Sequence, residues 1–481
     1  MPDAVSFPDQ VAHLATLAPA LLSRALRTGG RYGDLFYERT IHHRVTWRQQ
    51  AHPAKTEPPR HDQRGWRVEG VGFHVLGAAA AGFAATATLA PDDLAATAEA
   101  ASAQLGQAAA ARKAASLRAL SMGRSAPFDA PDAVSLLEKA ALVQAAAEAA
   151  LSLDACVSRV EVAYQDRMRR ALIATSEGAL RAVVSMLFGL RVEVVLAVGS
   201  DTVRGCAETG GAGGFGQAFA YPPEAVARAA VEQARRLVDA RPLRPGTMPV
   251  VLAGGWGGVW LHEAVGHLLE ADTLSSGEAP FAGRRDEVVA SPAVTLYDDA
   301  TLPGGRGTQA FDDEGTPAAR TTLIEDGVLR HYLTDGRTAH QLGLPRTGNA
   351  RRQDYRHPPL PRMTNLLLAA GNAAPGDLIA GVADGLYVAA VGRGRVAPDG
   401  RFAFDVLEGY RIEHGRCTTP VTGLRIVGRG PEVLGNVVGI GRDLQVETAR
   451  GLCEKAGQVV PVSLGMPTVL IRAMQVERGS G

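Results

Sequence analysis

The stretch Leu261–His267, with the sequence LHEAVGH, restricts the local fold more than any other, because it places two histidines five residues apart around a glutamate. In the HExxH helices of zinc hydrolases the two histidines are four residues apart and share one helix face. At a spacing of five, a regular helix of 3.6 residues per turn would point His262 and His267 roughly 140° apart. If both bind one metal, the chain must form a π-type turn or break the helix at Gly266.

Two other interpretations of this region stay open from the residues alone. A histidine on a buried helix is often a hydrogen-bonded core residue without any metal. The glycines in Gly254–Gly258 could also form a phosphate loop at a helix N-terminus. No Lys-Ser/Thr pair follows them, however, and Gly255-Trp256-Gly257 lacks the third glycine of a dinucleotide fingerprint. Nucleotide binding is therefore disfavoured.

A catalytic zinc needs a third protein ligand and an open position for water. Spacing does not choose among the downstream candidates, which are Glu270, Asp272, Asp286, Glu287, His331, His340, His357, Cys417 and Cys453. Cys453 stands out because it lies between glycines and polar residues in Gly451–Gly457, where a core hydrophobe would be out of place. A small buried thiol is the alternative there, and it is the more common role of cysteine.

Charge and cysteine content limit the partners and the compartment. Fifty basic and fifty acidic residues cancel, so no global charge favours nucleic acid or an anionic membrane. The four cysteines have no regular spacing, which indicates a reducing compartment. Residues 1–10 lack a signal-peptide pattern, and the apolar run of residues 77–90 is too short to span a bilayer. We expect a soluble cytoplasmic protein with no nucleic-acid or membrane partner.

Residues 1–90 are predicted to form a small α+β domain. An apolar helical pattern covers residues 11–26, and alternating runs at residues 34–38 and 66–75 predict strands. A polar, proline-rich loop at residues 52–63 separates the two strands. The order helix, strand, loop, strand is typical of an α+β unit.

Residues 91–243 are predicted to form a central helical and β segment. The signal is helical over residues 91–153, where Pro-Asp pairs indicate helix starts. Two strands with a hairpin turn between them are then expected at residues 157–164, Glu177-Gly178 and residues 190–196. A helix over residues 222–241 has a proline at its start and prolines after its end.

Residues 244–481 are predicted to form a mostly β C-terminal domain that carries one functional helix. A short strand at residues 249–253 runs into the glycines and then into the His262 helix. Further short strands are expected at residues 294–297, 402–406, 411–413 and 468–471. The predicted fold class is α+β: an N-terminal α+β domain with helices and mixed strands, and a mostly β C-terminal domain carrying the HExxxH helix.

Four longer motifs occur in order along the chain: HEAVGHLLEAD (His262–Asp272), FDDEGTP (Phe311–Pro317), GNARRQDYRHPPLPRMTN (Gly348–Asn365) and GLCEKAGQVVPVSLGMPT (Gly451–Thr468). Together they resemble the TldD/PmbA family of metallopeptidases, and specifically its zinc-bearing TldD-type subunit. The run Tyr32–Ala85 is similar to that family in layout. The resemblance extends over most of the chain.

The resemblance implies a site and an activity. In that family HExxxH supplies two histidine ligands and a glutamate base, and a cysteine in the C-terminal segment is the third ligand. It therefore implies that His262, His267 and Cys453 bind Zn²⁺ and that Glu263 is the general base. The expected function is that of a zinc-dependent metallopeptidase that hydrolyses unfolded or short peptides. The expected assembly is a heterodimer with a PmbA/TldE-like subunit, or a homodimer.

The chain departs from the family pattern at two positions. Leu268 follows the second histidine, where the family usually has glycine, and Ala271 stands at another position that is often glycine. Both changes leave the ligands intact, so they bear on substrate preference.

Other classes of function stay open. The protein could be a non-catalytic binding or regulatory subunit with a structural metal, or a hydrolase of non-peptide amides. The motif FDDEGTP and the segment RRQDYRH could line a substrate cleft, although Asp312–Gly315 is better interpreted as a solvated turn.

Overall fold

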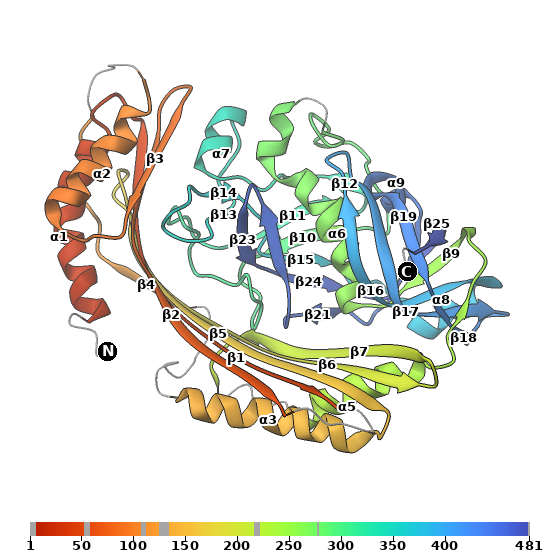
Figure 1. Ribbon diagram of the computed structural model, residues 1–481. Coiled ribbons are helices and arrows are strands. Elements are labelled where there is room, and N and C mark those ends of the chain that lie inside the picture. Colours follow the sequence, from red (N-terminus) through yellow and green to blue (C-terminus); the bar gives the residue numbers. More distant parts are fainter. Residues whose placement is uncertain are drawn as a thin grey trace.

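The computed structural model describes residues 6–51, 58–106, 112–124, 134–215, 222–276 and 279–479. Figure 1 shows a long, curved N-terminal sheet that has helices on its outer, convex side. A C-terminal half rich in short strands lies on the concave side of that sheet.

The N-terminal sheet has seven strands in the order β3-β2-β1-β5-β6-β4, with β7 also paired to β6. Its strands are β1 (Tyr32–Gln50), β2 (Arg60–Leu76), β3 (Ala81–Thr86), β4 (Ser121–Arg124), β5 (Val157–Thr175), β6 (Leu180–Val198) and β7 (Asp201–Ala212). Only the β4–β6 pair among these strands is parallel. The predicted turn at Glu177-Gly178 is confirmed between β5 and β6, where Gly178 has a φ of 88° that favours glycine.

Four helices cover the convex face. They are α1 (Phe7–Ala25), α2 (Pro91–Ala103), α3 (Leu136–Leu153) and α5 (Pro223–Arg236). Side chains alternate across β1, so Leu35 and Tyr37 pack in the core under α1 and α2. Phe36 points to the other face and packs with Tyr355 of the C-terminal half. The sheet is therefore buried on both faces and joins the two halves of the molecule.

The helical prediction for residues 91–153 is wrong in its middle. Helix α2 ends at Ala103, residues 112–120 have no regular structure, and β4 is a strand. Contacts with distant residues decide this segment: β4 pairs in parallel with β6, and a Cβ on Gly123 would overlap the side chain of Ala310. Residues 107–111 and 125–133 lie outside the described residues.

Two predicted boundaries also shift. The loop predicted for residues 52–63 ends earlier, because β2 already begins at Arg60; residues 52–57 are outside the described part of the chain. The helix predicted for residues 222–241 ends at Arg236. Residues Arg241–Pro242 instead form β8, which pairs with β18 (Arg416–Thr422) in the C-terminal half.

The C-terminal half contains a barrel. Strands pair in a closed ring, β16-β9-β25-β19-β17 and back to β16, and β8, β18 and β20 extend it. Their bounds are β9 (Gly246–Leu252), β16 (Asp384–Val396), β17 (Arg401–Glu413), β19 (Leu424–Arg429), β20 (Val437–Ile440) and β25 (Val469–Arg478).

A six-stranded sheet and two short hairpins complete this half. The sheet has the order β12-β11-β10-β15-β24-β21. Its strands are β10 (Leu296–Asp299), β11 (Arg320–Glu325), β12 (Val328–Leu329), β15 (Asn365–Leu368), β21 (Gln445–Glu447) and β24 (Ser463–Met466). The hairpins pair β13 (Ala350–Arg351) with β14 (Leu360–Pro361), and β22 (Leu452–Lys455) with β23 (Gln458–Pro461).

The helices of this half are short: α6 (Val259–Ala264), α7 (Gly336–Leu342), α8 (Pro375–Ala380) and α9 (Gly430–Gly435). The predicted α+β fold class, with a mostly β C-terminal half that carries the HExxxH helix, is confirmed. The domain divisions at residues 90 and 243 stay predictions, and strands from both sides of residue 90 share the N-terminal sheet.

Candidate metal centre

The helix that carries His262 ends before His267, so the five-residue spacing does not fall within one regular helix. The 3-10 turn η2 (Gly255–Gly258) leads into α6, which carries His262, and the 3-10 turn η3 (Gly266–Leu269) carries His267. Between them Val265 has φ −129° and ψ −53°, outside the helical region. Of the two predicted solutions, the break is therefore the one that forms, at the residue before Gly266. A Cβ on Gly266 would overlap Met363, so this glycine permits close packing of the broken segment.

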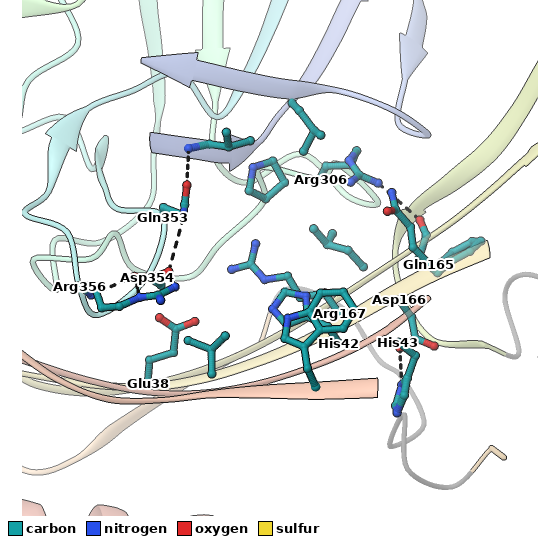
Figure 2. Close-up of a pocket in the computed structure, with 17 residues that line it drawn as sticks. Glu38, His42, His43, Gln165, Asp166, Arg167, Arg306, Gln353, Asp354 and Arg356 are labelled. Carbon is teal, nitrogen blue, oxygen red and sulfur yellow. Dashed lines mark hydrogen bonds and ion pairs between the residues drawn. The ribbon is translucent and has the colours of Figure 1, made fainter. Parts of the chain in front are cut away.

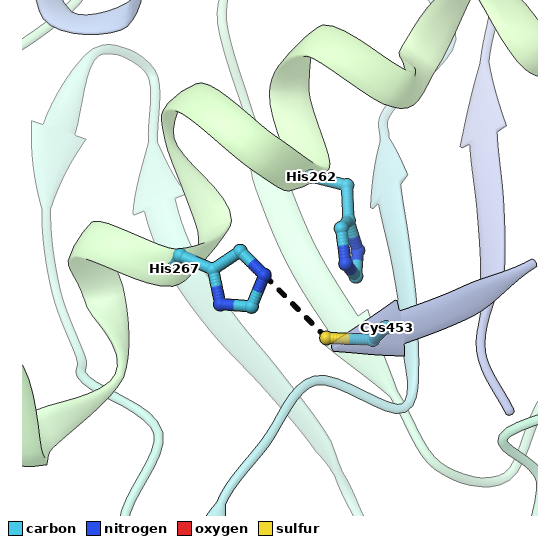
Figure 3. A group of neighbouring side chains, drawn as sticks. All are labelled: His262, His267 and Cys453. Carbon is cyan, nitrogen blue, oxygen red and sulfur yellow. Dashed lines mark hydrogen bonds between the residues drawn. The ribbon is translucent and has the colours of Figure 1, made fainter. Parts of the chain in front are cut away.

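The break brings three side chains together (Figure 3). His262 and His267 meet Cys453, which lies on β22, and their possible ligand atoms all lie within 4.8 Å of one another. The Cys453 Sγ is 3.5 Å from the His267 Nε2, and the two imidazole rings are 5.1 Å apart between centroids at an angle of 79°. Among the described residues, neither ring nitrogen of the buried His262 has a hydrogen-bond partner.

The local charges favour a thiolate beside a cation. Burial raises the pKa of the Cys453 thiol, but His262 and His267 outweigh it and hold that pKa well below its usual range. Burial lowers the pKa of His267, yet Glu270 and Cys453 together raise it well above its usual value. A positive charge between the imidazoles and the sulfur is thus favoured, and a divalent metal is the cation that suits this donor set.

Glu270 lies behind His267 and orients it. Its Oε2 is 2.8 Å from the His267 Nδ1, which leaves Nε2 directed at the sulfur. The Lys455 ammonium donates to Glu270 at 2.8 Å and to Asp272 at 2.6 Å, and the Met363 N–H donates to Glu270 at 3.2 Å. Burial favours a neutral Glu270, but His267 and Lys455 hold its pKa well below its usual range. Such carboxylate–histidine pairs fix the tautomer and orientation of metal-binding imidazoles.

The structure therefore gives Glu270 and Asp272 a supporting position behind His267, although spacing left them open as ligands. The sequence signal for Glu270 is its position three residues after His267. The remaining candidates do not join the group of His262, His267 and Cys453; they are Asp286, Glu287, His331, His340, His357 and Cys417. Asp286 pairs with Arg330, and Cys417 is exposed.

Glu263 lies at the edge of a cavity that opens beside this group. The cavity has a volume of about 650 Å³ and is lined by residues including Glu263, His267, Leu268, Pro398 and Glu454. The Glu263 side chain is 33% exposed, and its Oε2 is 3.9 Å from the His267 Nε2. A carboxylate there reaches both solvent and the ligand atoms. Leu268, one of the two departures from the family pattern, forms part of the cavity wall, whereas Ala271 is buried.

The acidic motif FDDEGTP lies elsewhere, and its interpretation as a solvated turn is wrong. Asp312 and Gly315 do close a turn, but Asp312, Asp313 and Glu314 are all buried. The Asp312 carboxylate accepts three backbone N–H bonds, and Asp313 pairs with Arg169 of the N-terminal sheet at 3.0 Å. The backbone N–H groups and Arg169 thus satisfy the buried carboxylates of Asp312 and Asp313, and the Asp313–Arg169 pair joins the two halves of the molecule.

Family models for the PmbA/TldA metallopeptidase central and C-terminal domains match residues 129–238 and 245–478. A TldD homolog named as a metalloprotease, from Haemophilus influenzae, is 37% identical over 326 residues, which are 66% of this chain and 68% of that protein. The chain belongs to the PmbA/TldD metallopeptidase family.

Other relatives agree with membership of the PmbA/TldD family. A metalloprotease from Methanothermobacter thermautotrophicus is 36% identical over 72% of this chain and 75% of its own length. A zinc metalloprotease TldD homolog from Saccharolobus solfataricus is 32% identical over 48% of this chain and 52% of that protein. The alignments with two Buchnera aphidicola relatives span about half of each chain, 48% in both cases.

Solved structures of the family's fold cover nearly the whole chain. A candidate modulator of DNA gyrase from Thermotoga maritima has a TM-score of 0.76 at 20% identity, over 96% of this chain and all (100%) of that one. TldE from Thermococcus kodakarensis has a TM-score of 0.69 at 17% identity, over 97% and 99%. At these identities the likeness shows the fold alone. In the described part of the chain, no helix combines the length and apolarity needed to cross a bilayer.

Proposed function

We propose that this protein is a zinc-dependent peptidase whose metal is held by His262, His267 and Cys453. The observation that carries the proposal is the pair of His262 ring nitrogens, which are buried and have no partner among the described residues. Leaving a buried polar group unpaired is costly, and a metal ligand is the role that removes the cost for an imidazole facing a thiol.

The donor set fits zinc. Two imidazoles and one thiolate are ligands that zinc prefers, and a catalytic site keeps a fourth position open for water. A zinc ion held there supplies a Lewis acid, which lowers the pKa of water and polarises a peptide carbonyl. The zinc metalloprotease name of the relative from Saccharolobus solfataricus supports this choice of metal.

Each of the neighbouring residues has a separate role in the proposed reaction. Glu263, at the edge of the cavity, accepts the proton of the attacking water on its carboxylate and returns it to the leaving amine. Glu270 holds His267 by its Nδ1, and Lys455 keeps Glu270 ionised. The cavity of about 650 Å³ admits a peptide segment beside these groups, so we propose unfolded or short peptides as substrates.

The proposed assembly is a heterodimer with a PmbA/TldE-like subunit, with a homodimer as the alternative. The similarity of fold between this chain and a structure named TldE, over 97% of this chain, supports the proposal. We also propose a reducing, cytoplasmic compartment, because all four cysteines are free and Cys453 must stay a thiol to bind metal.

The test combines metal content with peptide cleavage. Purified wild-type protein is expected to hold about one zinc per chain and to cleave an unfolded casein substrate. Glu263→Gln is expected to keep the zinc and lose the cleavage. Full cleavage by Glu263→Gln would contradict the base assignment, and zinc without cleavage of any peptide would favour a structural metal. Hydrolysis of small amides but not peptides would favour the amide hydrolase.

A further inference from the structure

A second cavity, of about 420 Å³, lies between the concave face of the N-terminal sheet and the C-terminal half (Figure 2). We call it the interlayer cavity. One row of directly paired residues crosses four strands on its floor: Trp66, His42, Arg167 and Leu187. The opposite wall includes Arg306 and the β22–β23 hairpin, which carries Cys453.

Arg167 points into this cavity and has no partner. Among the described residues its guanidinium makes no hydrogen bond and no ion pair. The nearby carboxylates are already engaged: Glu38 accepts the Tyr355 N–H at 3.0 Å, and Asp313 pairs with Arg169 at 3.0 Å. Burial first, and then the charge of Arg169, lower the pKa of Arg167 to about 10. A guanidinium offers five donors, so an unpaired one in a half-buried position is poised for an external acceptor.

Two more arginines add positive charge that no carboxylate neutralises. Arg306 is buried and donates only to backbone carbonyls, those of Phe188, Ala449 and Gly451 at 3.1–3.4 Å. Arg351 likewise donates to the carbonyls of Met363 and Pro461, at 2.6 and 2.7 Å. Arg351 lines a smaller adjoining cavity together with Arg167 and Arg306. Carbonyls satisfy the N–H groups, but they leave the charges in place.

The acidic residues of the interlayer cavity do not balance these charges. Asp354 is bound by Arg356 at 2.5 Å and by His357 at 2.9 Å. Asp166 is bound by Lys139 at 2.6 Å and by His43 at 2.8 Å. Glu38 lies 3.6 Å from Arg169, which also pairs with Asp313. The acidic residues of the lining are therefore paired with cations other than Arg167 and Arg306, and these two guanidinium groups leave positive charge in the cavity.

An apolar rim borders the positive floor. Leu452 is 56% exposed, Trp66 46% and Val459 37%, although all three are large apolar side chains. Trp66 stacks on His42 with ring centroids 4.7 Å apart and planes within 2°. A ligand that fits both features carries an anionic group next to an apolar one.

We propose that the interlayer cavity binds a carboxylate of a peptide, held by Arg167, with the adjoining apolar side chain against Trp66, Leu452 and Val459. A guanidinium matches a carboxylate with two parallel hydrogen bonds, which gives this pairing its specificity. The carboxylate is either the C-terminal group of the peptide or an acidic side chain. Only the peptide nature of the ligand rests on the proposed function. Because Leu452 precedes Cys453, a peptide held there contacts the hairpin that carries the metal-binding thiol.

The test measures binding without turnover. Zinc-loaded, full-length Glu263→Gln protein is titrated calorimetrically with a pentapeptide of four alanines and a final leucine, as free acid and as C-terminal amide. A third, amidated peptide carries one glutamate before the leucine. We expect the free acid to bind about tenfold or more tightly than the plain amide, as for a charge-assisted hydrogen-bond pair. Tight binding of the glutamate peptide as well would assign an acidic side chain as a second source.

Variants locate the effect. Arg167→Gln is expected to remove the preference for the acid, whereas Arg170→Gln, on the opposite face of the same strand, is expected to keep it. Because Arg167 forms no hydrogen bond or ion pair within the described ranges, its replacement is expected to leave the melting temperature equal or higher. Trp66→Ala, at the rim, is expected to weaken the binding of the peptide acid and of the peptide amide by the same factor.

Equal affinity of the zinc-loaded Glu263→Gln protein for the acid and the amide would overturn the proposal. An equal loss of the preference for the acid in Arg167→Gln and Arg170→Gln would overturn it as well. Peptide cleavage by the wild type is assayed separately. Absence of cleavage with the acid preference intact would refute the peptidase and leave the carboxylate site standing.

Discussion

Among the described residues, two clusters contain the residue types that bind metals, and they differ in whether a side chain of the protein already supplies a cation. The possible ligand atoms of His262, His267 and Cys453 lie within 4.8 Å of one another, and so do those of Asp34, His74 and Glu314. We call the second group the acidic cluster. In the acidic cluster a side chain of the protein supplies the cation: the Arg352 guanidinium donates a hydrogen bond to the Asp34 carboxylate at 2.8 Å.

The rest of the acidic cluster is only partly satisfied, because the Glu314 Oε1 has no hydrogen-bond partner among the described residues. The His74 Nδ1 lies 3.1 Å from the Asp34 Oδ2, and the Gly336 N–H donates to the Glu314 Oε2 at 2.7 Å. Burial and the charges of Asp335 and Asp312 raise the pKa of Glu314 well above its usual range, so this carboxyl favours its neutral form. At the metal centre, His262 also has no partner among the described residues, but the group borders a cavity. Ligand chemistry alone therefore does not define a metal site. The two clusters differ because Arg352 already supplies a cation to one of them, whereas a cavity borders the other.

The largest expected effect comes from removing a ligand at the metal centre. Cys453→Ala is expected to lose the zinc and to reduce peptide cleavage to background, because two imidazoles alone hold zinc weakly. A chelator should lower the melting temperature of the wild type, since a metal bound only by the folded state stabilises it, but not that of the variant. Metal content by mass spectrometry and thermal unfolding provide the readouts. If zinc stays bound in Cys453→Ala, the thiol is not needed for zinc binding, and the proposed set of ligands is refuted.

The next largest effect is expected for Glu263→Gln, which keeps the proposed ligands and removes the proposed general base. General-base catalysis contributes about 10²–10⁴-fold, so the cleavage rate is expected to fall by that factor at unchanged zinc content. Glu454→Gln removes a carboxylate from the same cavity and serves as the control. A similar loss in both variants would point to the charge of the cavity instead of proton transfer.

Arg352→Met tests the acidic cluster. It leaves the buried Asp34 without its cation, and breaking a buried ion pair in this way typically costs about 3–5 kcal/mol of unfolding free energy. The exposed Arg411 offers a matched control, for which Arg411→Met is expected to cost less than about 1 kcal/mol. Zinc content should be unchanged in both. Denaturant unfolding measures the difference, and zinc loss in Arg352→Met would mean that the clusters are not independent.

The smallest expected effect is that of Glu270→Gln. The amide still reaches His267 but lacks the charge that raises its basicity, so zinc affinity is expected to fall about 10–100-fold. Competition with a fluorescent zinc chelator measures the affinity. An unchanged affinity would show that Glu270 serves packing alone.

The sequence predicted those features that depend on local patterns. Period-two and helical patterns located α1, β1 and β2. The five-residue spacing of His262 and His267 predicted a departure from a regular helix on the condition that both bind one metal, and the helix does break between them. The proposed role of Cys453 came from the resemblance, because spacing did not choose among nine downstream candidates.

Features that depend on distant partners were missed. Lys455 reaches Glu270 across 185 positions of sequence, and Arg352 reaches Asp34 across 318. The burial of the FDDEGTP motif follows from such partners, and no local pattern contains them. The strand β4 was missed for the same reason, because it forms by pairing in parallel with β6.

The most direct test of the comparison is to locate zinc by anomalous diffraction, with data collected on both sides of the zinc absorption edge. We expect one strong peak, about 2.0–2.1 Å from imidazole nitrogens of His262 and His267 and about 2.3 Å from the Cys453 sulfur. A peak among Asp34, His74 and Glu314 with none at Cys453, or no peak in zinc-saturated protein, would contradict it.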